Sequence, residues 1–375
     1  MLQVAPIVSV SEMYDDNILM SPTDVKGDFV TAALLGGYAD LSTPLSDTQL
    51  QYMALAEKFA NYSQYDNVGA AQYFVLKHKQ ELSPETKLTL NDDYLQGDLT
   101  AGFGVGTSVA FNPGLGQTLL QGSGYWMNDA SGSLKHDFGD GITSNFSLSQ
   151  MTFHSNGVGY SFEQGGTGGF QYELSDTLSL GAADQFYDFR FSNFPAAESN
   201  WPQLTLNWQP TAQIKGSVYA GPAVEYTLSG PAPTHLYPGY LVSLSYSAEK
   251  WTAQVGGGET PMMLAGLGGA GVSEGGSGSF NYALGQYTSF TADASYAKYF
   301  GGGFNGDYYA YGAEIKSQLQ PWLMVFVQYA GIRRGLGGGT PAAALATGLP
   351  IGTQAVINIY MVGATVSFDL IKSAI

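Results

Sequence analysis

The chain has 375 residues, with 14 Lys or Arg against 31 Asp or Glu, so its formal net charge is −17. Only 12% of the residues are charged and 50 are Gly, a composition that excludes coiled coils and charged disordered tails. Cys is absent, which excludes disulfide frameworks, Cys-based zinc sites and thiol chemistry. The acidity argues against nucleic acid as a partner, because phosphate contacts require a basic surface.

The beginning of the chain, Met1–Pro6, has no basic region followed by an apolar stretch. We therefore expect no signal peptide in this chain. No apolar run approaches 18 residues, and the best one, Trp322–Ala330, is about half that length. A membrane-spanning helix is excluded. A membrane-spanning β-strand remains possible, because only every second residue of such a strand faces lipid and no continuous apolar run is needed.

Short turn signals recur along almost the whole chain. They are Leu41–Pro44, Leu82–Glu85, Phe138–Gly141, Leu174–Thr177, Trp208–Thr211, Ser247–Lys250, Leu284–Tyr287 and Leu319–Trp322. Longer connections rich in Gly, Asn, Ser and Pro lie between them. We place these near residues 15–27, 61–68, 98–119, 155–160, 192–200, 222–237, 259–277, 301–306 and 333–353. Such asymmetry is typical of outer-membrane barrels, whose periplasmic turns are short and external loops long.

The turns and loops together predict an all-β fold, a transmembrane antiparallel β-barrel of about eighteen strands. If Leu284–Gln286 is not a turn, the alternative is sixteen strands. Residues 1–375 then form a single outer-membrane domain with both ends on the short-turn side.

Alternation of apolar and polar residues supports this fold. In the segment 211–220, Ala212, Ile214, Val218 and Ala220 share one face, and Gln213, Lys215, Ser217 and Tyr219 share the other. Two segments deviate from the pattern. Phe29–Tyr38 is apolar on both faces, and Gly181–Arg190 requires a register change to direct its charged residues inward, which we attribute to a bulge.

Proline and tryptophan positions provide two further expectations. Four prolines lie in the predicted short turns, and we expect the other twelve in long loops or at strand ends, since proline cannot donate to a strand ladder. The turn prolines are Pro44, Pro84, Pro210 and Pro321. Trp208, Trp251 and Trp322 each lie within two residues of a short turn, as expected for a periplasmic aromatic girdle.

Soluble β-sandwiches, propellers and solenoids are the competing folds. They are built from strands of about five or six residues, whereas the alternating segments here are about twice that length or longer. Repeated Trp-Asp pairs, which are typical of propeller blades, do not occur.

Three segments resemble a known family. Pro6–Ile18, which ends on Tyr14-Asp15-Asp16-Asn17, is similar to the start of a family of outer-membrane β-barrel porins of Gram-negative bacteria, some of them encoded near exopolysaccharide genes. Leu284–Tyr296 and Val362–Asp369 resemble strands of that family. The resemblance implies a channel in the outer membrane. The chain departs from the usual pattern of outer-membrane barrels, which end on an aromatic residue, because Asp369–Ile375 follows Phe368.

Motifs for chemistry are weak. Gly266–Gly271 matches a dinucleotide fingerprint but lacks the following helix that the site requires, so we assign it to a loop, as we do Gly301–Asp307. The four histidines, His78, His136, His154 and His235, have no metal-ligand spacing. His154 beside Ser155 is the sole candidate for a hydrolase site, and an interfacial histidine is the favoured interpretation. The acidic run Asp15-Asp16-Asn17, with Asp24 and Asp28, allows a calcium site, although a solvated acidic loop is favoured.

Charged residues on the predicted inner face are the candidate pore lining. They are Glu57, Lys77, Lys79, Lys87, Asp93, Asp184, Asp188, Arg190, Lys215, Asp293, Glu314 and Lys316. Cross-strand pairing is the alternative role for them. We expect no plug domain before the first strand, and the 98–119 loop is long enough to fold inward and narrow the lumen.

The resulting functional hypothesis is a porin for passive diffusion of small hydrophilic solutes, without cofactor, metal or catalysis. The alternative is a structural or secretion barrel that exports exopolysaccharide or encloses a partner protein. Outer-membrane lipid and small solutes or ions are the expected partners, and a homo-oligomer such as a trimer remains open. The acidic excess predicts a modest cation preference, with Asp129 among the acids expected at the mouths.

Overall fold

The protein is described by a computed structural model that covers residues 1–19, 21–97, 125–155, 159–192, 195–228, 235–264, 269–301, 304–338, 353–368 and 371–373. Its long strands are β1 (Leu2–Asp15), β2 (Asp28–Ser42), β3 (Ser46–Phe59), β4 (Asn67–Ser83), β5 (Thr86–Gly97), β6 (Tyr125–Gly139), β7 (Ile142–Ser155), β8 (Gly159–Ser175), β9 (Leu178–Phe191), β10 (Ala197–Trp208), β11 (Ile214–Thr227), β12 (His235–Ser247), β13 (Trp251–Leu264), β14 (Gly269–Ala283), β15 (Thr288–Gly301), β16 (Phe304–Gln320), β17 (Leu323–Gly338) and β18 (Thr353–Ser367). A short strand, β19 (Ile371–Ser373), and a one-turn helix, η1 (Ser63–Tyr65), complete the described elements. Among the described residues, no helix has the length and apolar character required to cross a membrane.

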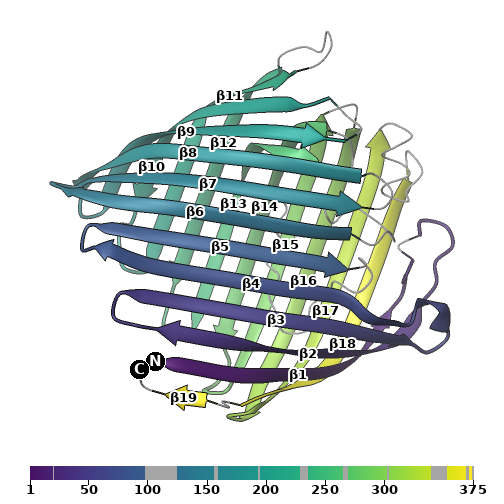
Figure 1. The fold of residues 1–375 in the computed structure, drawn as a ribbon. Coiled ribbons are helices and arrows are strands. Elements are labelled where there is room, and N and C mark those ends of the chain that lie inside the picture. Colours follow the sequence, from purple (N-terminus) through teal and green to yellow (C-terminus); the bar gives the residue numbers. More distant parts are fainter. Residues whose placement is uncertain are drawn as a thin grey trace.

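The strands form one closed antiparallel sheet. Each strand pairs with the next along the chain, and β1 pairs with both β2 and β18, which closes the barrel (Figure 1). All eight predicted short turns connect consecutive strands at one end, and the longer connections lie at the other. The predicted eighteen-stranded barrel is therefore confirmed, and the turn at Leu284–Tyr287 is one of its hairpins.

The segment after β18 does not disturb closure. The ladder between β1 and β18 begins at Ile7 and Ser367, and β19 pairs with Leu2–Val4 further along the same edge of β1. Pro6 lies between these two ladders, where no hydrogen bond to its nitrogen is required. Thus β18 closes the barrel by pairing with β1 from Ile7 onward, and β19 pairs with the beginning of β1, which β18 does not reach.

The two faces of the wall differ in chemistry. Successive residues of a strand point to opposite faces of the wall, and residues paired directly across two strands point to the same face. The pairs therefore show which residues share a face all around the barrel. The outer face exposes large apolar side chains through its middle, and Leu204 is 72% exposed. Other members of this band are Val8, Val10, Leu35, Phe146, Leu148, Val242, Val255, Val327 and Val362. An exposed apolar band of this kind is the surface that a lipid bilayer covers.

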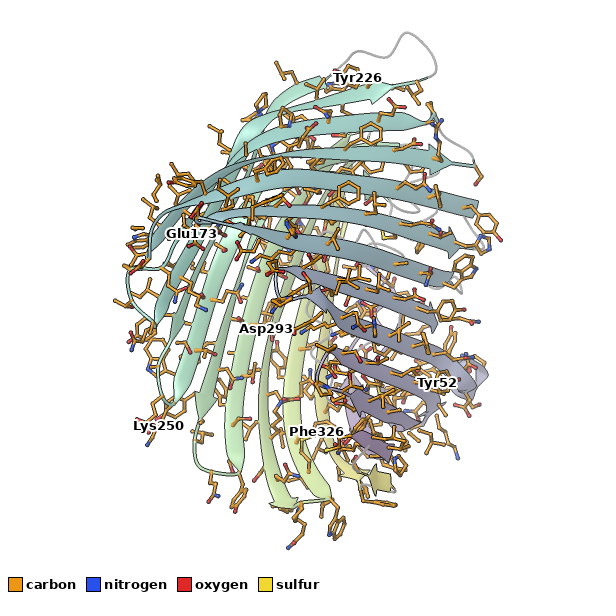
Figure 2. All side chains as sticks on the ribbon, turned by 60° about the vertical axis from the view of Figure 1, so that its left-hand side comes forward. Tyr52, Glu173, Tyr226, Lys250, Asp293 and Phe326 are labelled. Atoms are coloured by element: carbon orange, nitrogen blue, oxygen red, sulfur yellow. The ribbon has the colours of Figure 1, made fainter. Side chains whose placement is uncertain are left out.

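Aromatic rings border this band on both sides. On the short-turn side, Trp251 stacks on Tyr246 with ring centroids 4.6 Å apart, and Trp208 and Trp322 are exposed at or beside their turns. On the long-loop side, Tyr329 contacts Tyr360 at 5.0 Å. The three predicted tryptophans thus lie at one border of the band (Figure 2 labels Lys250, in the turn beside Trp251).

Several strands extend further toward the long-loop end than predicted, so the proline expectation is wrong. Pro202, Pro222, Pro238 and Pro261 lie inside β10, β11, β12 and β13. The sheet accommodates these prolines at positions where pairing with a neighbouring strand is interrupted or has ended, so the missing N–H of proline breaks no ladder there. Pairs between β10 and β11 are interrupted from Asn200 to Leu204, and the β12–β13 ladder ends at Tyr240 and Glu259. The glycine-rich segment after residue 268 is likewise strand β14 rather than loop.

The apolar character of both faces of β2 has a structural cause. Its outward residues Phe29 and Leu35 belong to the exposed outer face, whereas Val30, Ala32 and Leu34 are buried on the inner side. The inner residues join a cluster formed with β1, β3, β17 and β18. This cluster comprises Met13, Ile18, Val30, Ala32, Leu34, Met53, Leu55, Phe59, Phe326, Ala330, Ile357, Ile359 and Met361. Part of the inner wall is therefore a hydrophobic core rather than a wet surface.

Candidate pore and its lining

Most of the predicted lining residues lie on the inner face. Glu57 follows Met53 and Leu55 at alternate positions of β3, and Lys77, Lys79, Lys87 and Asp93 lie on the same face of β4 and β5. Lys215 lies on the inner face of β11. Asp293, Glu314 and Lys316 lie on the inner face of β15 and β16.

Three predicted lining residues lie on the outer face instead. Asp184, Asp188 and Arg190 alternate with Gln185, Tyr187 and Phe189, and these last three face inward. The β8–β9 ladder is regular from Ser179 to Phe191, and its one irregularity lies on β8 between Glu173 and Ser175, so the bulge expected within Gly181–Arg190 does not occur. The outward charges are compensated locally. Arg190 Nε lies 2.7 Å from Asp188 Oδ1, and the Asn200 amide donates to Asp184 at 3.1 Å.

Acidic residues outnumber basic residues on the inner face. The acids are Asp15, Asp28, Asp40, Asp47, Glu57, Glu81, Asp93, Asp129, Asp137, Glu163, Glu173, Glu225, Asp293 and Glu314, and the bases are Lys77, Lys79, Lys87, Lys135, Lys215, Lys316 and Arg334. Two lysines lie in ion pairs. Lys87 is 3.1 Å from Glu81, and Lys316 is 3.4 Å from Glu314.

Two pairs of acidic residues lie on opposite parts of the inner wall. Asp93 and Asp129 are direct cross-strand partners on β5 and β6. Asp293 and Glu314 lie on neighbouring positions of β15 and β16, about half the strands of the closed sheet away. Directly opposed carboxylates destabilise a sheet, so a pair such as Asp93 and Asp129 has an electrostatic cost. Asp129 was expected at a mouth, but the register places it on the inner wall.

The first long connection folds into the lumen. Ile18 is buried within the inner apolar cluster, and its backbone N–H donates to Lys26 O at 2.9 Å. The Asn17 amide donates to Val356 O at 2.9 Å, which ties the loop to β18. Residues 98–119, the segment long enough to fold inward and narrow the opening, lie outside the described residues. The described structure thus has another segment, residues 16–19 and 21–27, positioned at this end of the lumen.

The acidic run in this loop is engaged by hydrogen bonds within the protein. Asp16 accepts from the backbone and side-chain nitrogens of Asn358, both at 2.7 Å. Asp28 accepts from both nitrogens of Asn61 and from Tyr62 N. Asp24 lies 3.0 Å from Lys26, and its hydrogen bond raises the pKa of that ammonium. Within the described ranges, no group of three or more His, Asp or Glu side chains is arranged to hold a metal.

The histidines occupy separate places in the wall. His78 and His136 lie within 2.8 Å of the Thr48 and Thr86 hydroxyls at the short-turn end. His154 lies on the outer face, with its ring centroid 4.3 Å from that of Tyr160 and 6.2 Å from that of Trp126. His154 thus has the surroundings of an interfacial aromatic residue.

Sequence reasoning missed part of the inner wall. Asp129, Glu163 and serines on β9 and β12 face inward, although the period of two from neighbouring residues could have revealed them. Arg333 and Arg334 show the same alternation. Arg333 lies outward over the Tyr309 ring at 5.5 Å, and Arg334 is fully buried on the inner side opposite Tyr308.

Comparison with known proteins finds similarity only among solved structures. No family model and no curated protein matches the chain. Pseudomonas aeruginosa OccK2 (OpdF), solved in complex with glucuronate, is 10% identical with a TM-score of 0.49, and the match covers 99% of this chain and 98% of that one. P. aeruginosa OpdO is 12% identical with a TM-score of 0.47, covering 99% and 98%. A BenF-like porin from Pseudomonas fluorescens Pf-5 is 10% identical with a TM-score of 0.45, covering 98% and 99%. Similarity at this level does not extend to a ligand or a function.

Proposed function

We propose that the protein is an outer-membrane porin, a water-filled channel for passive diffusion of small hydrophilic solutes. The observation that carries the proposal is the division of the closed wall into two faces. The outer face has an apolar band bordered by aromatic rings, and most of the inner face carries hydroxyl, amide and charged groups. A barrel of this strand number is too wide for its own side chains to fill.

A modest preference for cations is part of the proposal. It is supported by the excess of carboxylates on the inner wall and by the positions of Asp93 and Asp129 opposite Asp293 and Glu314. Fixed negative charge raises the local cation concentration, but its reach is about 10 Å at 0.1 M salt. The preference should therefore be strongest in dilute electrolyte. Assembly into a homo-oligomer remains a prediction.

Conductance in planar bilayers tests this function. The purified barrel should give stepwise ohmic currents, and under a KCl gradient the reversal potential should favour K⁺ and diminish toward 1 M salt. Solute flux is measured independently by swelling of proteoliposomes in isotonic sugar. A folded barrel that neither conducts nor admits solutes would instead support the alternative, a structural or secretion barrel. A clear Cl⁻ preference would refute the proposed selectivity alone.

A further inference from the structure

A polar groove lies on the inner wall at the short-turn end of β8–β12, with a volume of about 420 Å³. Five of its lining side chains belong to one continuous row across the sheet. Glu173 pairs with Ser179, Ser179 with Asn207, Asn207 with Ser217, and Ser217 with Ser243. We call these five residues the polar row. Each strand along the row thus presents one hydrogen-bonding side chain to the lumen.

The spacing of the polar row suits an extended ligand. Directly paired residues have Cβ atoms about 4.5–5.5 Å apart, a repeat comparable to the length of one pyranose residue. The Ser217 and Ser243 hydroxyls are 2.7 Å apart and bond to each other. Hydroxyl and amide groups can both donate and accept, which is the requirement for recognising the hydroxyls of a sugar or polyol. The row continues to Gly256 on β13, where no side chain obstructs it.

The charges of the groove disfavour an anionic ligand. Glu173 on β8, Asp176 in the turn after it and Lys215 on β11 line the groove, so it has one carboxylate in excess. The strands of Glu173 and Lys215 are three spacings apart, about 14 Å at the usual distance between strands. The ammonium and carboxylate of one amino acid lie too close together to be bound by both residues at once. Uncharged hydrogen-bonding groups occupy the space between them.

We propose that the polar row is a weak, saturable binding site for neutral polyhydroxylated solutes, namely sugars and short oligosaccharides. This inference rests on the proposed channel function and specifies one class of its solutes. Sugar hydroxyls exchange their water for the serine hydroxyls and the Asn207 amide as the molecule passes the short-turn end of the lumen. Because this exchange is nearly balanced in free energy, binding slows the passage of the sugar without trapping it.

Current block by maltotriose tests the proposal. In native protein, maltotriose should reduce the K⁺ current in a concentration-dependent, saturating way. The double variant Ser217→Ala, Ser243→Ala removes two hydroxyls with little change of volume, and it should raise the half-blocking concentration about tenfold. The matched control is Ser147→Ala, Ser149→Ala on the inner face of β7, outside the polar row, and it should match native protein. Unsaturable block, or an equal shift in the control, would overturn the inference.

A second measurement separates this inference from the channel function. Saturation-transfer NMR of maltotriose with the detergent-solubilised barrel reports contact without requiring conductance. Signal that is present in native protein and weakened in the Ser217→Ala, Ser243→Ala variant supports the site even when the barrel carries no current, in which case only the channel function fails. Normal conductance without maltotriose signal refutes the site and leaves the channel function intact.

Discussion

The indole of Trp201 on β10 lies against the backbone of Gly239 on β12. A Cβ atom added to Gly239 would fall 2.5 Å from the indole nitrogen and 2.6 Å from the adjacent ring carbon. Trp201 is only 3% exposed on the inner wall, so the ring cannot move aside freely. A bulky side chain on one strand thus requires glycine two strands away.

Gly239→Ala should therefore destabilise the barrel. Overpacking of this kind costs about 1–3 kcal/mol, and displacement of the indole should change the tryptophan emission. To measure stability, samples are heated to a series of temperatures and then separated on a gel without further heating. The temperature at which the band of the folded barrel disappears is compared between variants. Gly285→Ala, in a short turn with no atom within 4 Å of the added Cβ, is the control and should match native protein. Equal stability of the two variants would contradict the observed packing.

Asp28 should be important for order at the long-loop end. Its carboxylate accepts from Phe29 N, both nitrogens of Asn61 and Tyr62 N, and thereby holds residues 60–66 against β2. Asp28→Ala leaves these donors unsatisfied, at about 1–3 kcal/mol for a buried group. Hydrogen exchange and proteolysis within residues 60–66 should both accelerate.

Asp24→Ala is the matched control for Asp28→Ala. It removes only the exposed pair with Lys26, and pairs of this kind contribute about 0–1 kcal/mol. Exchange in residues 60–66 should stay at the native rate. If both variants accelerate exchange equally, the Asp28 contacts do not hold this loop.

The double variant Asp93→Asn, Asp129→Asn should reduce cation preference. It removes two adjacent lumenal carboxylates, and we expect the K⁺ to Cl⁻ permeability ratio to fall roughly twofold in dilute salt, because the local potential becomes less negative. Reversal potentials under a KCl gradient measure the change. Asp184→Asn removes a carboxylate from the outer face and should leave the ratio unchanged. A larger effect from Asp184→Asn would place β9 in the other register.

Single-cysteine labelling should separate the two faces of β12. The native chain contains no Cys, so labelling has no background. In proteoliposomes, Ser243→Cys should react with a membrane-impermeant maleimide, whereas Val242→Cys, on the exposed apolar band, should react only with a lipid-soluble one. Fast reaction of Val242→Cys with the impermeant reagent would show that water, not lipid, covers the band.

Local sequence patterns were enough to predict the fold class, the strand number and the positions of the eight short turns. These depend on local chemistry, since turn residues such as Pro44 and Pro84 act within a few positions and the period of two is read within one strand. The same period correctly placed Lys77, Asp93 and Asp293 on the inner face. Local patterns were sufficient wherever one face was plainly polar.

Tertiary contacts determine which face each residue of β9 occupies, where the prolines of β10–β13 are accommodated and how residues 16–19 and 21–27 pack on the inner wall. Polar groups occur on both faces of β9, so its orientation follows from hydrogen-bonded pairing with β8 and β10. Pro202 and Pro238 are tolerated because ladders with neighbouring strands are interrupted beside them. Ile18 is buried by residues as distant in sequence as Ile357. Each of these outcomes depends on contacts between segments far apart in the chain, which a local pattern does not encode.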